Sequence, residues 1–583
     1  MNQKQPQIKR REFSQSSAIQ LDGFSPLLMR VFAHRGITDQ SQLDYRLSNL
    51  CSPATMLGVK KAGEILASSI EKGERILIVG DFDADGATSS ALATHALQAM
   101  GAQSIEYLVP NRFDYGYGLT PEIVDVAAEK NPDVIVTVDN GISSVEGVER
   151  ANSLGIRVVV TDHHLPGNTL PNAQAIVNPN QPGCNFPGKS LAGVGVIFYV
   201  LSQVRSLLDQ NSWFERQRIE KPNMANYLDL VALGTVADVV TLDDQNRLLV
   251  HQGLQRMRAG RVRPGIRALF DVSKRSIESA IASDIGFGVA PRINAAGRLD
   301  DMSLGIRCLL AENYDQAREL ASELNDLNQD RRAIESSMQQ EALKSLAELK
   351  NLHEDEQPWG MCLFNEQWHQ GVIGILASRI KDQFHRPVIA FAQSDSSDEI
   401  KGSARSIAGI HIRDALDAVA TSNPGLIEKF GGHAMAAGLT IQKHLFSEFC
   451  AAFDSEIRRV AQQENFTAQI FSDGELTPEE FNLENAHQLR NAGPWGQNFP
   501  EPTFDGEFLL LTQRLVGEKH LKMTVAPASD AQTVIDAIAF NVNLQCWPDP
   551  NVRRIRAAYQ LDVNEFRGKE SVQLRIEFLQ ALE

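Results

Sequence analysis

Three aspartates occupy alternate positions of a short acidic segment, "GDFDADG", at residues 80–86. Alternate side chains of an extended backbone point the same way, so Asp81, Asp83 and Asp85 can present three carboxylates to one point. Three like charges held together repel one another unless cations neutralise them. An EF-hand calcium loop is excluded, because it requires a glutamate at its twelfth position, where this chain has Leu92. The segment therefore indicates a metal site, with a solvated acidic turn as the alternative.

Carboxylates and imidazoles recur after later hydrophobic runs. Asp139 follows "VIVTV", Asp162, His163 and His164 follow "VVVT", and Asp238 lies in "GTVADVV". Each has an ordinary alternative, since an aspartate at a strand end often caps a helix and adjacent histidines can be a chance pair. Carboxylate and imidazole ligands without thiolates suit Mn²⁺ or Mg²⁺ better than zinc or iron.

Four β-branched runs have the length and composition of buried strands, and helical patterns separate them. The runs are residues 75–80, 104–110, 133–139 and 156–162. Strands that alternate with helices of this length predict βαβ units and a parallel, doubly wound sheet, which binds ligands at the carboxyl ends of its strands. Because the acidic residues and histidines follow the first, third and fourth runs, we expect them to converge at one edge of the sheet.

Five carboxylates and two imidazoles provide enough ligands for two ions. Two cations roughly 3.5–4 Å apart are the usual arrangement for phosphoester hydrolysis, in which they activate a water and neutralise charge on the phosphate. One carboxylate should bridge the two ions, and Asp139 is the candidate. The sequence contains no Walker-type glycine-rich loop with Lys-Ser/Thr, which disfavours nucleotide hydrolysis by that route.

The composition is that of a soluble globular protein with several domains. The chain has 583 residues, of which 43% are hydrophobic and 22% charged, and its net charge is −17. This charge does not exclude nucleic acid, because binding depends on local basic grooves. The six cysteines form no CxxC pair, which argues against disulfides and a thiolate zinc site. The absence of a signal sequence and of a long apolar run predicts a cytoplasmic protein.

The second half of the chain changes character. Residues 315–350 are rich in Ala, Leu, Glu and Gln without Gly or Pro, which predicts one long helix or two stacked ones. Residues 358–464 resume an α/β pattern. From about residue 505, short alternating runs separated by turns predict an all-β domain the size of a barrel.

In order and spacing, "GDFDADG", "VDNG", "DHH" and "GTVADVV" resemble the four motifs of the DHH phosphoesterase superfamily. "APRINAAGRLDD" (290–301), "GVIGILASRI" (371–380), "GSARSI" (402–407) and "FGGHAMAAG" (430–438) are similar to further motifs of members that degrade single-stranded DNA. The resemblance covers nearly the whole chain from about residue 20, although Phe82 and Ala404 depart from the family pattern. It implies a parallel-sheet DHH domain joined by a long helix to a smaller α/β DHH-associated domain, plus a C-terminal all-β OB-fold.

The resemblance also implies domain boundaries. These are an N-terminal extension (1–50), the DHH catalytic domain (51–310), a connector helix (311–352), the DHH-associated domain (353–465), and a linker with the OB-fold (466–583).

Individual roles follow from the same resemblance. Two Mn²⁺ or Mg²⁺ ions are expected among Asp81, Asp83, Asp85, Asp139, His163 and Asp238, with His164 beside the scissile phosphate. Asp83, Asp85, Asp139, His163 and His164 are the expected catalytic residues. Asp162 is either a ligand or a group that orients a histidine.

Phosphate and DNA contacts are expected from arginines and from a glycine-rich segment. The candidates are Arg112, Arg292, Arg298, Ser403, Arg405, Gly432 and His433, since guanidinium forks match phosphate oxygens and glycines let backbone amides approach them. The alternatives are surface arginines without a ligand, and a tight turn before a helix at residues 430–438.

Two further regions could hold the strand. The basic stretch 255–275 is a candidate phosphate track, with an exposed loop that binds no ligand as its alternative. The predicted barrel offers Arg553, Arg554, Arg556 and Tyr559, in the combination of basic and aromatic side chains that binds single strands.

The resemblance implies a 5′→3′ exonuclease that degrades single-stranded DNA to mononucleotides in DNA repair and recombination. We expect a monomer without membrane association, with a single-stranded-DNA-binding protein and recombination helicases as partners. Two alternatives stay open. A DHH hydrolase of small substrates, such as pyrophosphate, cyclic dinucleotides or short oligonucleotides, should lack the C-terminal barrel and the connector. A non-catalytic DNA-binding scaffold should lack some of the metal ligands.

Overall fold

The computed structural model describes residues 6–12, 21, 23–110, 118–347, 357–394, 396–462, 466–544 and 546–582. The chain forms two compact units. The larger comprises Arg11–Asn328 and Asp473–Glu583, and the smaller comprises Met1–Arg10 and Gln329–Ser472. Each unit is therefore built from segments that lie far apart in the sequence.

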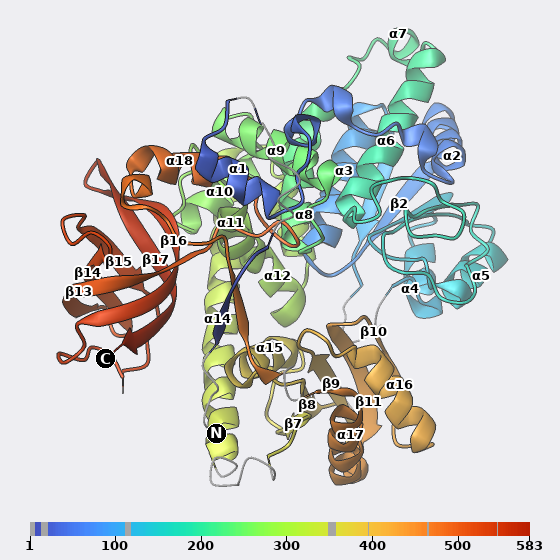
Figure 1. Cartoon of the computed structure of the whole chain (residues 1–583). Helices are drawn as coiled ribbons and strands as arrows, with labels where there is room; N and C mark the ends of the chain where they lie inside the picture. The colour runs from blue at the N-terminus through green and yellow to red at the C-terminus, as the bar shows by residue number, and fades with distance from the viewer. Residues whose placement is uncertain are drawn as a thin grey trace. The chain divides into compact units, whose positions relative to one another are not determined.

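The larger unit contains a five-stranded parallel sheet (Figure 1). Its strands are β2 (Arg75–Gly80), β3 (Ser104–Leu108), β4 (Val134–Val138), β5 (Arg157–Thr161) and β6 (Ala175–Val177), in the order β3-β2-β4-β5-β6. The four predicted runs are thus confirmed as strands β2 to β5. Because β3 and β4 lie on opposite sides of β2, the strand order reverses between β2 and β4, and such a reversal is where α/β sheets bind ligands.

Helices cover both faces of this sheet, as the hydrophobic runs require. Apolar side chains of α4 (Pro121–Ala128) and α5 (Val145–Ser153) pack with Leu77 and Val79 of β2 on one face. Those of α2 (Val59–Lys72), α3 (Ala84–Ala99) and α6 (Gly193–Gln210) pack with Ile76 and Ile78 on the other. The predicted doubly wound architecture is therefore confirmed.

Further helices of the larger unit surround this core. They are α1 (Pro26–Ala33), α7 (Trp213–Gln217), α8 (Leu228–Ala237), α9 (Asp244–Arg258), α10 (Pro264–Val272), α11 (Ala282–Asp284), a π-helix (Ile285–Val289), α12 (Ala290–Leu299) and α13 (Ser303–Leu310). The predicted connector is one continuous helix, α14 (Tyr314–Ala347). Within the described residues, we find no helix that is both long and apolar enough to cross a membrane.

The C-terminal part of the larger unit is a closed barrel, as predicted for the all-β region. Helix α18 (Leu483–Asn491) precedes it. Its strands are β13 (Phe504–Val516), β14 (His520–Pro527), β15 (Ile535–Ala539), β16 (Arg554–Phe566) and β17 (Lys569–Leu582), in the order β13-β14-β15-β17-β16.

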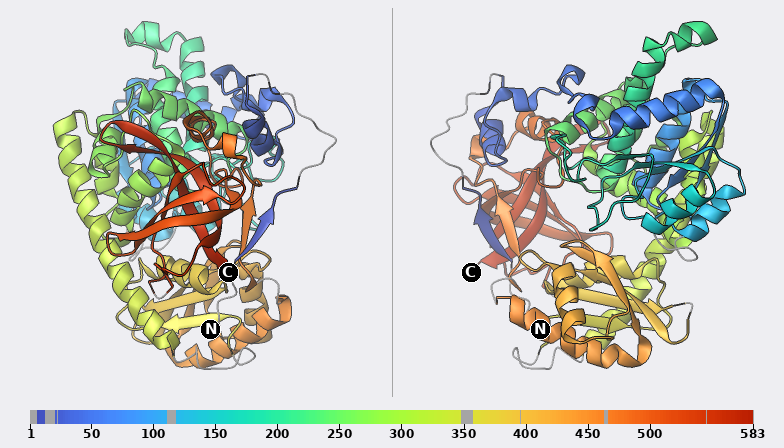
Figure 2. Two further views of the ribbon diagram at one scale, coloured as in Figure 1. Left: turned by 60° about the vertical axis from the view of Figure 1, so that its left-hand side comes forward. Right: turned by 90° about the vertical axis from the view of Figure 1, so that its right-hand side faces the viewer.

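The smaller unit has a mixed sheet in the order β10-β11-β9-β8-β7. Its elements are β7 (Met361–Phe364), α15 (Ile373–Phe384), β8 (Val388–Gln393), β9 (Glu399–Arg405), α16 (Ile412–Ser422), β10 (Lys429–Gly432), β11 (Ala436–Gln442) and α17 (Phe446–Val460). The segment "FGGHAMAAG" connects β10 to β11 as a hairpin, so the alternative of a turn before a helix is wrong. A separate pair, β1 (Gln7–Arg10) and β12 (Gln469–Ser472), runs side by side in parallel (Figure 2).

Candidate active site

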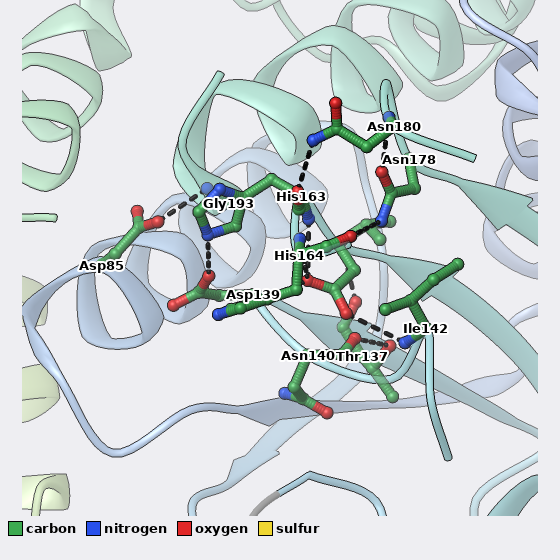
Figure 3. A network of polar contacts seen from close by, with 12 residues as sticks. Asp85, Thr137, Asp139, Asn140, Ile142, His163, His164, Asn178, Asn180 and Gly193 are labelled. Atoms are coloured by element: carbon green, nitrogen blue, oxygen red, sulfur yellow. Dashed lines mark hydrogen bonds and ion pairs between the residues drawn. The ribbon is translucent and has the colours of Figure 1, made fainter. Parts of the chain in front are cut away.

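The candidate ligands gather at the carboxyl ends of three neighbouring strands (Figure 3). Asp81 follows β2, Asp139 follows β4, and residues 162–164 follow β5. Asp238 comes from another element, since it is the C-cap of α8. The next residue, Val239, has a φ of 60°, a strained conformation for a β-branched side chain and one that is often found at functional sites.

Asp83 and Asp85 are held by the first turns of two helices. Asp83 is the N-cap of α3, and its carboxylate accepts from the backbone N–H groups of Asp85 at 2.9 Å and Gly86 at 3.0 Å. Asp85 is buried, and its carboxylate accepts from the N–H groups of Gly193 at 2.6 Å and Val194 at 3.0 Å, at the positive end of α6. The expectation of one extended acidic segment is therefore wrong, because α3 begins at Ala84 and contains Asp85.

Asp139 and His163 meet across the ends of β4 and β5. Asp139 has a φ of 64°, which aspartate tolerates better than most residues, and its N–H donates to the Thr161 carbonyl at 3.0 Å. Its Oδ1 lies 3.1 Å from Nε2 of His163 (Figure 3). A Cβ at Gly193 would lie 2.5 Å from the Cβ of Asp139, so this close approach requires glycine at the start of α6.

Asp162 holds both histidines in place. Its Oδ1 accepts from the backbone N–H groups of His163 at 2.7 Å and His164 at 3.0 Å, and lies 2.7 Å from Nδ1 of His164. Its Oδ2 accepts from the N–H of Ile142 at 2.9 Å. Although burial favours the neutral carboxyl, the hydrogen bond with His164 lowers the pKa of Asp162. Burial also opposes charge on His164, but the same bond raises the pKa of that imidazole to about 9.

Seven residues form three overlapping groups of ligand atoms, and within each group the atoms lie within 4.8 Å of one another. The groups are Asp139, His163 and His164; Asp85, His163 and Asp238; and Asp81, Asp83 and Asp139. In addition, His163 Nε2 lies 3.4 Å from Asp238 Oδ2. These oxygen and nitrogen donors fit hard divalent cations such as Mn²⁺ and Mg²⁺.

The cluster is electrostatically suited to cations. Burial, followed by the charge of Asp83, raises the pKa of Asp85 to about 7. Burial and the neighbouring carboxylates raise the pKa values of Asp139 and Asp238 well above the usual range. A divalent cation would offset this repulsion and favour the charged carboxylates, so the residues present fit a metal centre.

Sequence reasoning missed three asparagines that support the cluster. Asn178 donates to the His164 carbonyl at 2.9 Å, and Asn180 donates to the His163 carbonyl at 2.6 Å. The Oδ1 of Asn294 accepts from the N–H of Ala84 at 2.8 Å, where α12 meets the start of α3. Asn178 directly follows β6, so a polar residue at a strand end was the available signal.

The candidate arginines of the larger unit differ in their surroundings. Arg292 is buried, and its guanidinium donates to the carbonyls of Gly288 and Val272 and to Oδ1 of Asn325. Arg298 is half-buried in the last turn of α12. Arg112 lies outside the described residues. The contacts of Arg292 are those of a side chain that braces α12.

In the smaller unit, the sheet brings the remaining candidates to one end, namely Ser403, Arg405, Gly432 and His433. Arg405 Nη1 donates to Ser403 Oγ at 3.0 Å. A Cβ at Gly374, in the first turn of α15, would lie 2.8 Å from the Arg405 guanidinium and 2.9 Å from Ser403 Oγ. A guanidinium, a hydroxyl and a helix start thus lie together, which suits a phosphate.

The barrel corrects one expectation about strand binding. Tyr559 is 0% exposed and packs against Phe504 and Phe508 in the barrel core, so it is not available for stacking on a base. Among the described residues of the barrel domain, Phe540 and Phe566 have exposed rings. The basic residues are partly paired, since Arg554 lies 2.9 Å from Glu507 and Arg556 lies 3.8 Å from Asp505, whereas Arg553 is exposed.

Two arginines of the basic stretch 255–275 pair with acids of the larger unit, and the role of the stretch as a phosphate track stays a prediction. Arg263 forms an ion pair with buried Asp229, and Arg275 lies 3.2 Å from Asp284. These arginines therefore stabilise the helical part of the larger unit.

Three family models match consecutive parts of the chain. They are the DHH family N-terminal domain at residues 75–235, the DHHA1 domain at 359–459 and the RecJ OB domain at 472–577. The single-stranded-DNA-specific exonuclease RecJ of Escherichia coli is 52% identical over 573 residues, which cover 98% of this chain and 99% of that protein. The chain belongs to the RecJ family. The RecJ of Haemophilus influenzae is 48% identical, with 99% of both proteins covered.

Membership in the RecJ family confirms the predicted enzyme class, an exonuclease and thus a hydrolase. It also confirms the predicted combination of DHH, DHH-associated and OB domains. The crystal structure of RecJ from Thermus thermophilus with Mn²⁺ matches with a TM-score of 0.77 at 29% identity, covering 96% of this chain and 76% of that one. The Mg²⁺ complex matches with a TM-score of 0.72 at 27% identity, covering 96% and 75%.

Proposed function

We propose that this RecJ-family exonuclease degrades single-stranded DNA from the 5′ end to mononucleotides, by phosphodiester hydrolysis at two divalent cations. The observation that carries the proposal is the overlap of three ligand groups within one cluster. Relatives that share about half of its sequence are named single-stranded-DNA-specific exonucleases, and a related structure holds Mn²⁺. We place the reaction in DNA repair and recombination.

In this proposal the candidate ligands would divide between two cation positions. Asp139 belongs to two of the three groups, and a carboxylate can bridge two cations with its two oxygens, whereas the single Nε2 of His163 binds one. Asp139 is therefore the proposed bridge, with Asp81 and Asp83 on one side and Asp85, His163 and Asp238 on the other. Two Mn²⁺ or Mg²⁺ ions held there would supply Lewis acidity and a more acidic water.

The chain's own side chains prepare the substrate. Asp162 fixes the ring of His164 through Nδ1, and the proposed role of this ring is to donate from Nε2 to an oxygen of the scissile phosphate. The proposed catalytic residues are Asp83, Asp85, Asp139, His163 and His164. Asp162 acts as the positioning residue for both histidines.

Phosphate contacts away from the cluster are proposed for Arg112, Arg292, Arg298, Ser403, Arg405, Gly432 and His433. The arrangement of Arg405, Ser403 and α15 supports this assignment best, and the burial of Arg292 supports it least. The domain boundaries at residues 51, 311, 353 and 466 belong to the same proposal, as do a monomeric state and partnership with a single-stranded-DNA-binding protein and recombination helicases.

The proposal is tested by incubating the protein and Mn²⁺ with end-labelled single-stranded DNA, duplex DNA and a dinucleotide, alongside Asp139→Ala. We expect mononucleotides from single-stranded DNA, early loss of a 5′ label, and at least about a 1,000-fold lower rate in the variant, since a bridging site supplies several kcal/mol. Early loss of a 3′ label, or an unchanged rate in Asp139→Ala, would overturn it. Preference for the dinucleotide would favour a small-substrate hydrolase, and binding without cleavage would favour a scaffold.

A further inference from the structure

A polar cavity lies in the larger unit, and it shares no residue with the candidate metal cluster. It is formed where α9 meets residues 281–283 and the segment that follows α18. The polar wall includes His251, Arg258, Ser283, Arg490 and the acidic Glu501, and the apolar lining includes Leu254 and Trp495. The cavity encloses about 20 Å³ open to the centre of a water molecule. That is room for one or two waters, or for the oxygens of one phosphate group.

Helix α9 presents its cavity residues on one face. His251, Leu254 and Arg258 are spaced three and four residues apart, which places them in line along the helix. The Nε of Arg258 donates to the Ala280 carbonyl at 2.8 Å, which fixes the plane of its guanidinium. Arg490 comes from the last turn of α18.

The two guanidiniums lie close enough to repel each other. After burial, the charge of Arg490 is the largest cause of the lowered pKa of Arg258. Among the described residues, neither arginine has a carboxylate oxygen within 4.0 Å. The nearby acids are already paired, because Glu501 lies 2.7 Å from Arg575 and Asp284 lies 3.2 Å from Arg275.

The histidine lies in this positive wall as a neutral ring that is already hydrogen-bonded to its neighbours. Burial and the charge of Arg258 lower the pKa of His251, whose ring also bonds to the backbone of Gly493 and lies 2.8 Å from Nε2 of Gln255. The cavity therefore combines two guanidinium groups and a hydroxyl, and the carboxylate in its lining, that of Glu501, is paired with Arg575. An anion with several oxygens would satisfy this set of donors.

We propose that the cavity between α9 and α18 binds a phosphate group, held by Arg258 and Arg490. Bound there, the anion links a helix of the catalytic part to the helix that leads into the barrel. The phosphate group comes either from the backbone of the bound DNA strand, a source that rests on the proposed function, or from free inorganic phosphate.

The first test is thermal unfolding in EDTA, with potassium phosphate compared against potassium chloride of equal ionic strength. We expect phosphate to raise the Tm of the wild type by about 2 °C or more, saturably, because it binds only the folded state. In the absence of phosphate, Arg490→Gln should have a higher Tm than the wild type, because the repulsion between the two guanidiniums is removed. Phosphate should no longer raise the Tm of Arg490→Gln, whereas Arg490→Lys should keep part of this response. Arg413→Gln, on an exposed position of α16, should respond like the wild type.

A phosphate response that persists in Arg490→Gln, or a wild type that responds to phosphate no more than to chloride, would overturn the proposal. If Arg490→Gln loses both its stability and its response to phosphate, Arg490→Lys decides the outcome. A folded Arg490→Lys variant whose Tm does not respond to phosphate also overturns the proposal. Since EDTA prevents catalysis, this outcome is independent of whether the chain degrades DNA.

The second test assigns the source, by measuring the affinity for labelled single-stranded DNA in EDTA over a range of salt. If the strand supplies the phosphate, Arg490→Gln weakens binding several-fold, lowers the slope of log affinity against log salt by about 0.7, and inorganic phosphate competes. Unchanged DNA affinity in a variant that has lost the Tm response assigns the site to free phosphate. Either outcome supports the cavity as a phosphate site.

Discussion

At the scale of single residues, the cluster contains side chains that provide candidate ligand atoms and other side chains that hold those ligands in place. Burial, followed by the charges of Asp85 and Asp83, raises the pKa values of Asp139 and Asp238. Asp162 has the opposite environment, with three backbone N–H groups and an imidazole around its carboxylate. The open question from the sequence, whether Asp162 binds a metal or orients a histidine, is therefore answered by our proposal in favour of orientation.

Asp162→Asn tests this division. The asparagine loses one acceptor oxygen, so His164 is no longer fixed through Nδ1, while the ligand groups keep all their members. We expect a 10–100-fold lower kcat/KM on single-stranded DNA with two Mn²⁺ ions still bound, as for other groups that orient metal-site residues. Asp125→Asn, at an exposed surface pair with Arg150, is the control and should match the wild type. Full activity in Asp162→Asn would contradict the assigned role.

At the scale of elements, the first turn of α6 is as much a part of the site as the strand ends. Its N–H groups donate to the Asp85 carboxylate, and its first residue, Gly193, packs directly on Asp139. Two acids, one in the first turn of α3 and one at the end of β4, are thus positioned by a helix that carries none of the candidate ligands.

Gly193→Ala is expected to damage the site. A Cβ there would lie 2.5 Å from the Cβ of Asp139 and 2.7 Å from its Oδ1, so either α6 or Asp139 must move. We expect a loss of about 1–3 kcal/mol in stability, typical of overpacking, and a fall in nuclease activity larger than the loss of folded protein explains. Gly167→Ala is the matched control, because nothing lies within 4 Å of its Cβ. Equal activity in the two variants, by end-labelled cleavage, would refute the argument.

The strands of the parallel sheet and the edge at which the candidate ligands gather were predictable from the sequence, for physical reasons. Four β-branched runs predicted strands β2 to β5, and the rule for parallel sheets then placed Asp81, Asp139 and His163 at one edge. Contacts that depend on tertiary packing were not predictable. Neither the burial of Arg292 against carbonyls nor the burial of Tyr559 in the barrel is encoded in local pattern, since each is decided by the partners that the fold supplies.

At the scale of the whole molecule, a buried ionic cluster connects the beginning and the end of the larger unit. Asp473, which directly follows β12, accepts from both terminal nitrogens of Arg35 at 3.0 Å and lies 3.0 Å from Nδ1 of His34. It also accepts from the N–H of Thr503 at 3.2 Å. The cluster therefore joins the end of α1 to the segment that leads into the barrel.

Asp473→Asn should destabilise the protein in a pH-dependent way. Removing a buried charge that pairs with cations costs about 3–5 kcal/mol. Although burial raises it, the hydrogen bonds from His34 and Arg35 bring the pKa of Asp473 below its usual 3.8, so the stabilisation is present above that pH and is lost as pH falls through the lowered value.

The midpoint of urea unfolding should therefore be lower in Asp473→Asn than in the wild type at pH 7, and the two should approach each other below about pH 4. Asp209→Asn removes an exposed pair with Lys221 and should change little at either pH. A difference between Asp473→Asn and the wild type that is the same at pH 3 and pH 7 would show that the carboxylate's charge is not what stabilises the unit.

We propose that one cluster holds two cations with Asp139 between them, and a Mn²⁺ binding isotherm with the metal-free protein tests this arrangement. The account predicts two ions per wild-type chain, and at most one in Asp139→Ala together with at least about a 1,000-fold loss of single-stranded-DNA cleavage. Two ions bound with wild-type affinity by Asp139→Ala, or a wild type that cleaves with a single ion bound, would contradict it.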